Sequence, residues 1–98
     1  MNDQQIEQEI QAKGKTAARV TPADIEAEIM GETYTVLPSG RVTVCELTLK
    51  NGFTVRGESA VVHIENFNIE IGRKISRENA SKQIWQLLGF RLRDQLAQ

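Results

Sequence analysis

The dipeptide Asn51-Gly52 constrains the fold of this chain more than any other feature of its sequence. Asn-Gly favours the type I′ turn, in which both central residues need a positive φ, and this turn joins two antiparallel strands. Residues 41–50, which precede it, are rich in Val, Thr and Leu, the residue types that strands prefer. The sequence therefore predicts a β-hairpin in which Thr48 pairs with Val55.

This register gives the predicted sheet two apolar faces. Leu47 and Leu49 lie on one face, whereas Phe53 and Val55 lie on the other. An antiparallel sheet with one side in water carries apolar residues on one face only. Either a helix covers each face or a second subunit covers one of them, and oligomerisation is a common remedy for the thin core of a small domain. We therefore expect a homo-oligomer with Phe53 and Val55 in its interface.

A short helix is expected before the hairpin. Thr21 and Pro22 are typical of a helix start, which predicts a helix over 22–30 that ends at Gly31 in a left-handed cap. We expect an antiparallel meander of three or four strands. The first passes through Tyr34 and Val36, the next two form the hairpin, and a short last strand covers 60–64.

The last third of the chain has the apolar spacing of a long helix. Asn66 is its expected cap, and Ile71 and Ile75 lie four residues apart in the apolar stripe that follows. Gly89 predicts a kink or a break in this helical segment. The sequence thus predicts a single α+β domain over 21–98, with a short N-terminal helix, an antiparallel meander and a long C-terminal helical segment.

Residues 1–20 are rich in Gln, Glu, Lys and Ala and carry Ile6 and Ile10 as one narrow apolar stripe. Such a stripe is too small to hold a helix in place by itself. This segment is expected to be a flexible tail, or a helix that forms only against a partner chain. In the second case Ile6 and Ile10 belong to the interface.

Charge is divided unequally along the chain. Residues 1–72 hold six basic and eleven acidic side chains, a net charge of −5, whereas residues 73–98 hold six basic and two acidic side chains, a net charge of +4. The total of −1 excludes a polybasic binder of long nucleic acids or membrane surfaces. The basic C-terminal segment still suits a small anion, since arginine binds phosphate through two nitrogens and an aromatic ring stacks on a base. The expected ligand-binding residues are Arg73, Lys74, Arg77, Arg91, Phe53 and Trp85.

Two alternatives for these basic residues stay open. They form a solvated helix face, paired with acidic residues at helical spacing, or they pair with the acidic first half of the chain at an oligomer interface.

The sequence contains no catalytic or metal-binding constellation. His63 is its only histidine, and Cys45, its only cysteine, lies in a predicted strand, away from any helix N-terminus that would activate it. Neither has a second ligand at metal spacing, and Glu26 and Glu28 are expected to be solvated. We expect no enzyme, no metal and no cofactor. Since no apolar run approaches the roughly 18 residues of a membrane span, we expect a soluble, cytoplasmic protein.

Several blocks of this sequence, taken together, resemble one known family. They include Thr48-Leu49-Lys50-Asn51-Gly52-Phe53, Gly57-Glu58-Ser59, Asn66-Phe67, Ile71-Gly72-Arg73-Lys74-Ile75, Arg77-Glu78-Asn79-Ala80, Ile84-Trp85 and Gly89-Phe90. In this order, over about residues 21–96, they are similar to the Gp49/Gp66 family of small phage and prophage proteins typed by phages N4 and Sf6. The resemblance implies expression in the cytoplasm of a bacterial host. It implies no activity, because the function of that family is unknown.

Two functions follow as hypotheses. The architecture also resembles that of small phage anti-defence proteins that oligomerise and sequester cyclic nucleotide signals. By that analogy Arg73, Arg77 and Arg91 would clamp the phosphates of a signalling nucleotide between subunits, and Phe53 would stack on its base. The alternative is a protein–protein interaction module that binds or inhibits a host protein, for example a defence protein, or a minor phage assembly component.

Overall fold

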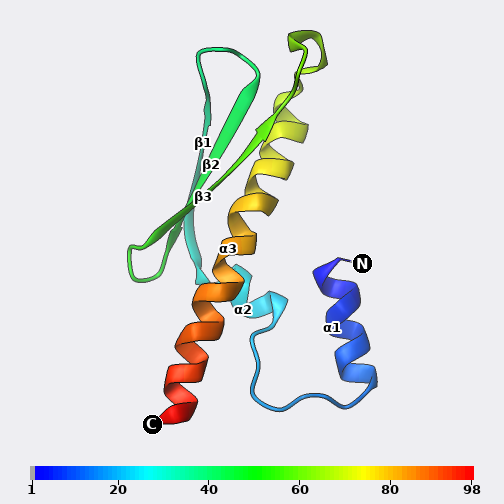
Figure 1. The fold of residues 1–98 in the computed structure, drawn as a ribbon, viewed down its shortest axis with the longest axis vertical. Coiled ribbons are helices and arrows are strands. Elements are labelled where there is room, and N and C mark those ends of the chain that lie inside the picture. The colour runs from blue at the N-terminus through cyan, green and yellow to red at the C-terminus, as the bar shows by residue number, and fades with distance from the viewer. Residues whose placement is uncertain (1) are drawn as a thin grey trace.

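The computed structural model describes residues 2–98 as a three-stranded antiparallel sheet with a long helix across one face (Figure 1). The elements are α1 (Asp3–Ala12), α2 (Pro22–Glu28), β1 (Ile29–Val36), β2 (Val42–Leu49), β3 (Thr54–Ala60), the 3-10 helix η1 (Ile64–Asn66) and α3 (Ile69–Ala97). The sheet order β1-β2-β3 is a simple meander, so the predicted α+β class is confirmed. Among residues 2–98, no helix has both the length and the apolar character needed to cross a membrane.

The turn between β2 and β3 contains three residues instead of two. The N–H of Leu49 donates to the C=O of Phe53 at 2.8 Å, and the N–H of Gly52 donates to the C=O of Leu49 at 2.9 Å. Gly52 has a φ of +89°, but Asn51 has no positive φ. The predicted type I′ turn is therefore wrong, because only one of its two central residues adopts the left-handed conformation. Residues 50–52 form instead the three-residue hairpin loop that ends in a left-handed glycine.

The additional loop residue shifts the strand pairing by one position. Leu47 pairs with Val55, so the two side chains lie on the same face of the sheet. Val55 is 3 % exposed and belongs to the core, where it is not free to enter an interface. The predicted pair of apolar faces is also wrong, because the face away from α3 is mostly polar. Its residues on the three strands include Thr33, Thr35, Val42, Val44, Glu46, Thr48, Thr54, Arg56 and Glu58.

The core lies between the sheet and α3. The side chains of β2 alternate strictly, so that Thr43, Cys45, Leu47 and Leu49 are buried. Helix α3 meets them with a stripe at intervals of four residues, formed by Gly72, Ser76, Ala80, Ile84 and Leu88.

Small residues let the helix approach the sheet closely. A Cβ atom on Gly57 of β3 would lie 2.2 Å from the backbone nitrogen of Ala80 and 2.5 Å from the carbonyl oxygen of Ser76. A Cβ atom on Gly72 would lie 2.6 Å from the hydroxyl of Thr43. Residues 76–80 of α3 therefore lie almost against the backbone of β3, and Gly72 lies against the side chain of Thr43, so that neither glycine leaves room for a larger side chain.

Several boundaries differ from those predicted. Helix α2 ends at Glu28, and Gly31 is a strand residue beside a bulge, with no left-handed φ. Residues 61–66 contain η1 and an irregular segment in place of a fourth strand. Helix α3 is capped by Asn68 and not by Asn66. It continues through Gly89 without a break, since one glycine costs a helix about 1 kcal/mol and Leu88 beside it is held in the core.

Residues 3–12 form α1, whose N-terminus is closed by a capping box from Asn2. None of its residues is buried, and Ile6 is 43 % exposed. Polar side-chain contacts join α1 to more distant parts of the chain: Arg19 pairs with Glu7, and the indole N–H of Trp85 donates to Asp3 at 3.2 Å. Figure 1 shows α1 beside the domain at the end of an extended segment. That α1 needs a partner chain stays a prediction.

Candidate functional site

The basic residues predicted to bind a ligand lie on different sides of α3. Since the buried stripe recurs every four residues, Arg73 and Arg77 lie on the flank towards β1, and Lys74 lies on the side away from the sheet. Arg91 follows Arg77 by about four helical turns, roughly 21 Å along the axis. It lies on the other flank, beside the β2–β3 hairpin.

Arg77 is held by two carboxylates of the same chain. Its two terminal nitrogens donate to the two carboxylate oxygens of Glu26 at 3.1 and 3.0 Å, and its Nε donates to Glu32 at 3.1 Å. The hydrogen bond from Arg77 lowers the pKa of Glu26, and the same contact raises the pKa of Arg77. All three nitrogens of this guanidinium therefore already bind carboxylates from the acidic first half of the chain.

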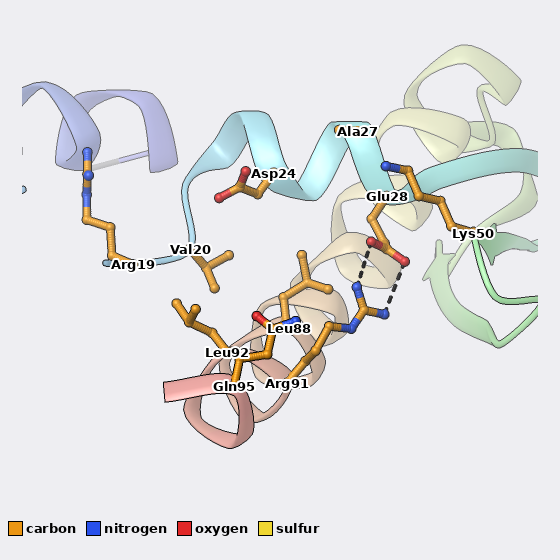
Figure 2. Close-up of a pocket in the computed structure, with 10 residues that line it drawn as sticks. All are labelled: Arg19, Val20, Asp24, Ala27, Glu28, Lys50, Leu88, Arg91, Leu92 and Gln95. Carbon is orange, nitrogen blue, oxygen red and sulfur yellow. Dashed lines mark hydrogen bonds and ion pairs between the residues drawn. The ribbon is translucent and has the colours of Figure 1, made fainter. Parts of the chain in front are cut away.

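Arg91 makes a second bidentate pair, with Glu28 (Figure 2). Its terminal nitrogens donate to the two carboxylate oxygens at 3.0 and 3.3 Å. Glu28 is 5 % exposed, so the expectation that it is solvated is wrong. The hydrogen bond from Arg91 is the main reason why the pKa of Glu28 lies below its ordinary value.

A cavity of about 260 Å³ surrounds this pair at the junction of α2 and α3. Figure 2 shows Val20, Leu88 and Leu92 on its apolar side and Lys50 beside Glu28, while Arg19 points away towards α1. The one arginine directed into the space is neutralised by Glu28.

The other predicted ligand-binding residues do not complete a shared pocket. The guanidinium of Arg73 lies over the ring of Tyr34, 5.3 Å from its centroid. Trp85 is half-buried against the core and bonded to Asp3. Phe53 is 55 % exposed and lines a small cavity with Arg91, the one aromatic–arginine pair of the predicted set that the single chain brings together. Within one chain Arg73, Arg77 and Arg91 do not converge.

The remaining groups with possible reactivity are isolated. Cys45 is fully buried, and this burial raises the pKa of its thiol. The Nδ1 atom of His63 accepts a hydrogen bond from the N–H of Glu65 at 3.1 Å. In the part of the chain that the structure describes, no group of three or more His, Cys, Asp or Glu side chains is placed to hold a metal ion.

The β1–β2 turn and the β3–α3 connection lie at the same end of the molecule, uppermost in Figure 1, and large apolar side chains are exposed there and on the first turns of α3. We call this group of side chains the distal patch. Its members are exposed large apolar side chains, of which Val62 is the most exposed at 95 %: Leu37, Val62, Ile64, Ile71 and Ile75.

Contacts among these segments bring the distal patch together. The N–H of Val61 donates to the C=O of Arg41 at 3.0 Å, and a Cβ atom on Gly40 would lie 3.2 Å from the side chain of Ile64. Ile71 and Ile75 share the flank of Asn79, which donates to the carbonyl oxygen of Glu58 in β3 at 2.9 Å. Both isoleucines therefore lie on the side of α3 where the chain leaves β3.

Periodicity alone assigns Ile71 and Ile75 to the core, whereas the structure exposes both. The reason is that Gly72 and Ser76 face the sheet, where only small side chains fit. The small residue that follows each isoleucine was the sequence signal that could have identified the buried side of the helix.

A family model described as the phage protein (N4 Gp49/phage Sf6 gene 66) family matches residues 20–96. This range contains α2, all three strands and nearly all of α3. No curated protein and no solved structure matches the chain.

Proposed function

This chain belongs to the N4 Gp49/phage Sf6 gene 66 family of phage proteins, and from that premise we propose that it is a non-enzymatic accessory protein that binds another protein in the host cytoplasm. The observation that supports this most is the distal patch, which gathers exposed aliphatic side chains from three separate segments. Exposed apolar patches of this kind commonly mark protein–protein contacts. The partner we infer presents a complementary apolar surface and is either a host protein or another phage protein.

The ion pairs of Arg77 and Arg91 favour this function over nucleotide sequestration. A phosphate that bound either guanidinium through its fork would displace a carboxylate already bound there. At Arg91 it would also leave the buried carboxylate of Glu28 without a partner, which is costly. Sequestration of a signalling nucleotide is therefore the second hypothesis, and the aromatic–arginine pair of Phe53 and Arg91 is the observation in its favour.

Site-specific photo-crosslinking in phage-infected host cells tests the proposal. A photoreactive residue at Val62 is expected to capture one discrete partner, and the same residue at Glu46, on the polar face of the sheet, is expected to capture none. The additional change Ile71→Asp should abolish capture at Val62 without loss of the fold, since Ile71 is exposed.

Two results would overturn this function. One is equal capture, or equal lack of capture, at Val62 and Glu46. The other is saturable heat in a calorimetric titration with cyclic dinucleotides, cyclic trinucleotides or cyclic ADP-ribose isomers, lost in Arg91→Ala or Phe53→Ala. That result would establish nucleotide binding instead.

A further inference from the structure

The two outer edges of the sheet differ in how their backbone groups are satisfied. At the β3 edge, Asn79 and Gln83 of α3 donate side-chain hydrogen bonds to the carbonyl oxygens of Glu58 and Arg56. Amide side chains thus cover the acceptors that an approaching strand would need. Sheet edges left uncovered are sites where another strand can pair.

The β1 edge has no such cover. The N–H of Leu37 donates to the C=O of Val42 at 2.9 Å, which makes these two residues a hydrogen-bonded pair of the β1–β2 ladder. Because such pairs alternate along an antiparallel ladder, the backbone N–H and C=O groups of Glu32, Tyr34 and Val36 point outward. Among residues 2–98 no hydrogen bond to these outward groups is found.

From Gly31 to Val36, β1 has few of the features by which proteins block an edge strand. Its only bulge lies between Ile29 and Gly31, and from there to Val36 the pairing is regular. This stretch has no proline and no lysine. Its one charged residue, Glu32, is already paired with Arg77 at 3.1 Å.

The position of α3 leaves space for another strand. The helix packs across β2 and β3, so β1 lies beside it at the margin of the sheet (Figure 1). Thr33, Thr35 and Val36 of β1 are all exposed. Neither α1 nor α2 runs along this edge beyond the start of the strand.

We propose that β1 is a dimerisation strand, through which two copies of this chain pair antiparallel about a two-fold axis at Tyr34 and form one six-stranded sheet. This register places Tyr34 opposite Tyr34 of the second copy, and Thr33 opposite its Thr35. Aromatic pairs and Thr–Thr pairs across strands are favourable. Glu32 then faces Val36 of the second copy, so no two carboxylates are opposed.

The contact is self-complementary, as a two-fold interface must be. A second copy is therefore the occupant that the sequence of this edge fits. The inference does not depend on the distal patch. It replaces the interface predicted at Val55, which is buried, whereas an interface at the exposed Phe53 stays a prediction.

Sedimentation equilibrium on the purified chain tests the dimer. Val36→Pro removes an outward N–H at the last residue of β1, and Ala60→Pro makes the matched change at the last residue of β3. The wild type and Ala60→Pro should form the same dimer, whereas Val36→Pro should dissociate at least about tenfold more readily. Far-ultraviolet circular dichroism verifies that both variants stay folded. A monomeric wild type up to millimolar concentration, or equal dimers for both variants, would overturn the proposal.

Disulfide trapping tests the register. Thr33→Cys and Thr35→Cys place thiols on the exposed polar face of β1, and Cys45 is too buried to compete. A mixture of the two variants should form the interchain disulfide under mild oxidation faster than either variant alone, because residues directly opposite one another are closest. Equal rates for the mixture and the single variants would contradict the pairing about Tyr34.

Discussion

The guanidinium of Arg91 binds both carboxylate oxygens of Glu28, at 3.0 and 3.3 Å, although the two residues lie 63 positions apart in the chain. Arg77 does the same for Glu26 and reaches Glu32 as well. Some of the excess basic side chains of residues 73–98 thus form ion pairs with acidic side chains in the first half of the same chain. An uneven charge distribution in the sequence here reflects ion pairs within the fold.

The Arg91–Glu28 pair is expected to stabilise the fold measurably. Arg91→Ala leaves a carboxylate that is 5 % exposed without its partner, so the free energy of unfolding should fall by about 1–3 kcal/mol, less than for a fully buried pair because Arg91 itself is half exposed. Urea unfolding measures the change. Arg93→Ala, at an exposed position two residues on, should alter stability by no more than about 0.5 kcal/mol. Equal losses in both variants would contradict this role.

Glu28 should also make stability depend on pH. Because Arg91 lowers the pKa of Glu28 below its ordinary value of 4.5, the unfolded chain takes up this proton at a higher pH than the folded chain. The stabilisation is complete well above pH 4.5 and is lost as the pH falls through the lowered pKa. The difference in unfolding free energy between wild type and Glu28→Gln should therefore shrink below about pH 5. Urea titrations at a series of pH values measure it, and a constant difference would refute the linkage.

Replacement of Arg77 by lysine is expected to lower the stability of the fold. Lys has no planar fork, so Arg77→Lys cannot bind both oxygens of Glu26 and also reach Glu32 in the same way. We expect a loss of about 0.5–1.5 kcal/mol, which decreases in high salt because the pair is partly exposed. Arg73→Lys, which changes a contact with the Tyr34 ring alone, should cost less. A larger loss from Arg73→Lys would reverse this order.

Two glycines should respond in opposite directions to replacement by alanine. At Gly57 the new methyl group would lie 2.2 Å from a backbone atom of α3, so Gly57→Ala should cost about 3 kcal/mol or prevent folding. At Gly89 no atom lies within 4 Å of the new methyl group, so Gly89→Ala should stabilise α3 by about 0.5–1 kcal/mol. Thermal unfolding of the two variants distinguishes these outcomes. Destabilisation by Gly89→Ala would argue for the kink that the structure lacks.

The hairpin shows how far local sequence determines this fold. Asn51-Gly52 correctly locates the turn, but it suits loops of two and of three residues alike. The choice between them depends on packing: only the three-residue loop puts Val55 on the same face as Leu47, beneath α3. A contact between β3 and a helix that begins fifteen or so residues later decides the register, and no local pattern contains it.

The ion pairs of Arg77 and Arg91 could not be predicted from the sequence for a related reason. The sequence shows that Arg77 and Arg91 are basic and that α2 is acidic, but not that α2 ends beside α3. That placement follows from the meander, which brings the start of β1 alongside the end of β2 and so brings Glu28 to Lys50 and Arg91. The helix start at Thr21 was predictable, because its capping box is contained within four residues.

The buried stripe of α3 has small residues in its first half, at Gly72, Ser76 and Ala80, and large ones in its second half, at Ile84 and Leu88. The helix therefore lies close to the sheet over residues 72–80 and has room for large side chains in its C-terminal half. Tolerance to substitution should differ in the same way. Positions 84 and 88 should accept other aliphatic residues, whereas position 72 should accept hardly any residue other than glycine. Relatives of this chain with diverged sequences should thus be recognisable by their small residues more than by their large ones.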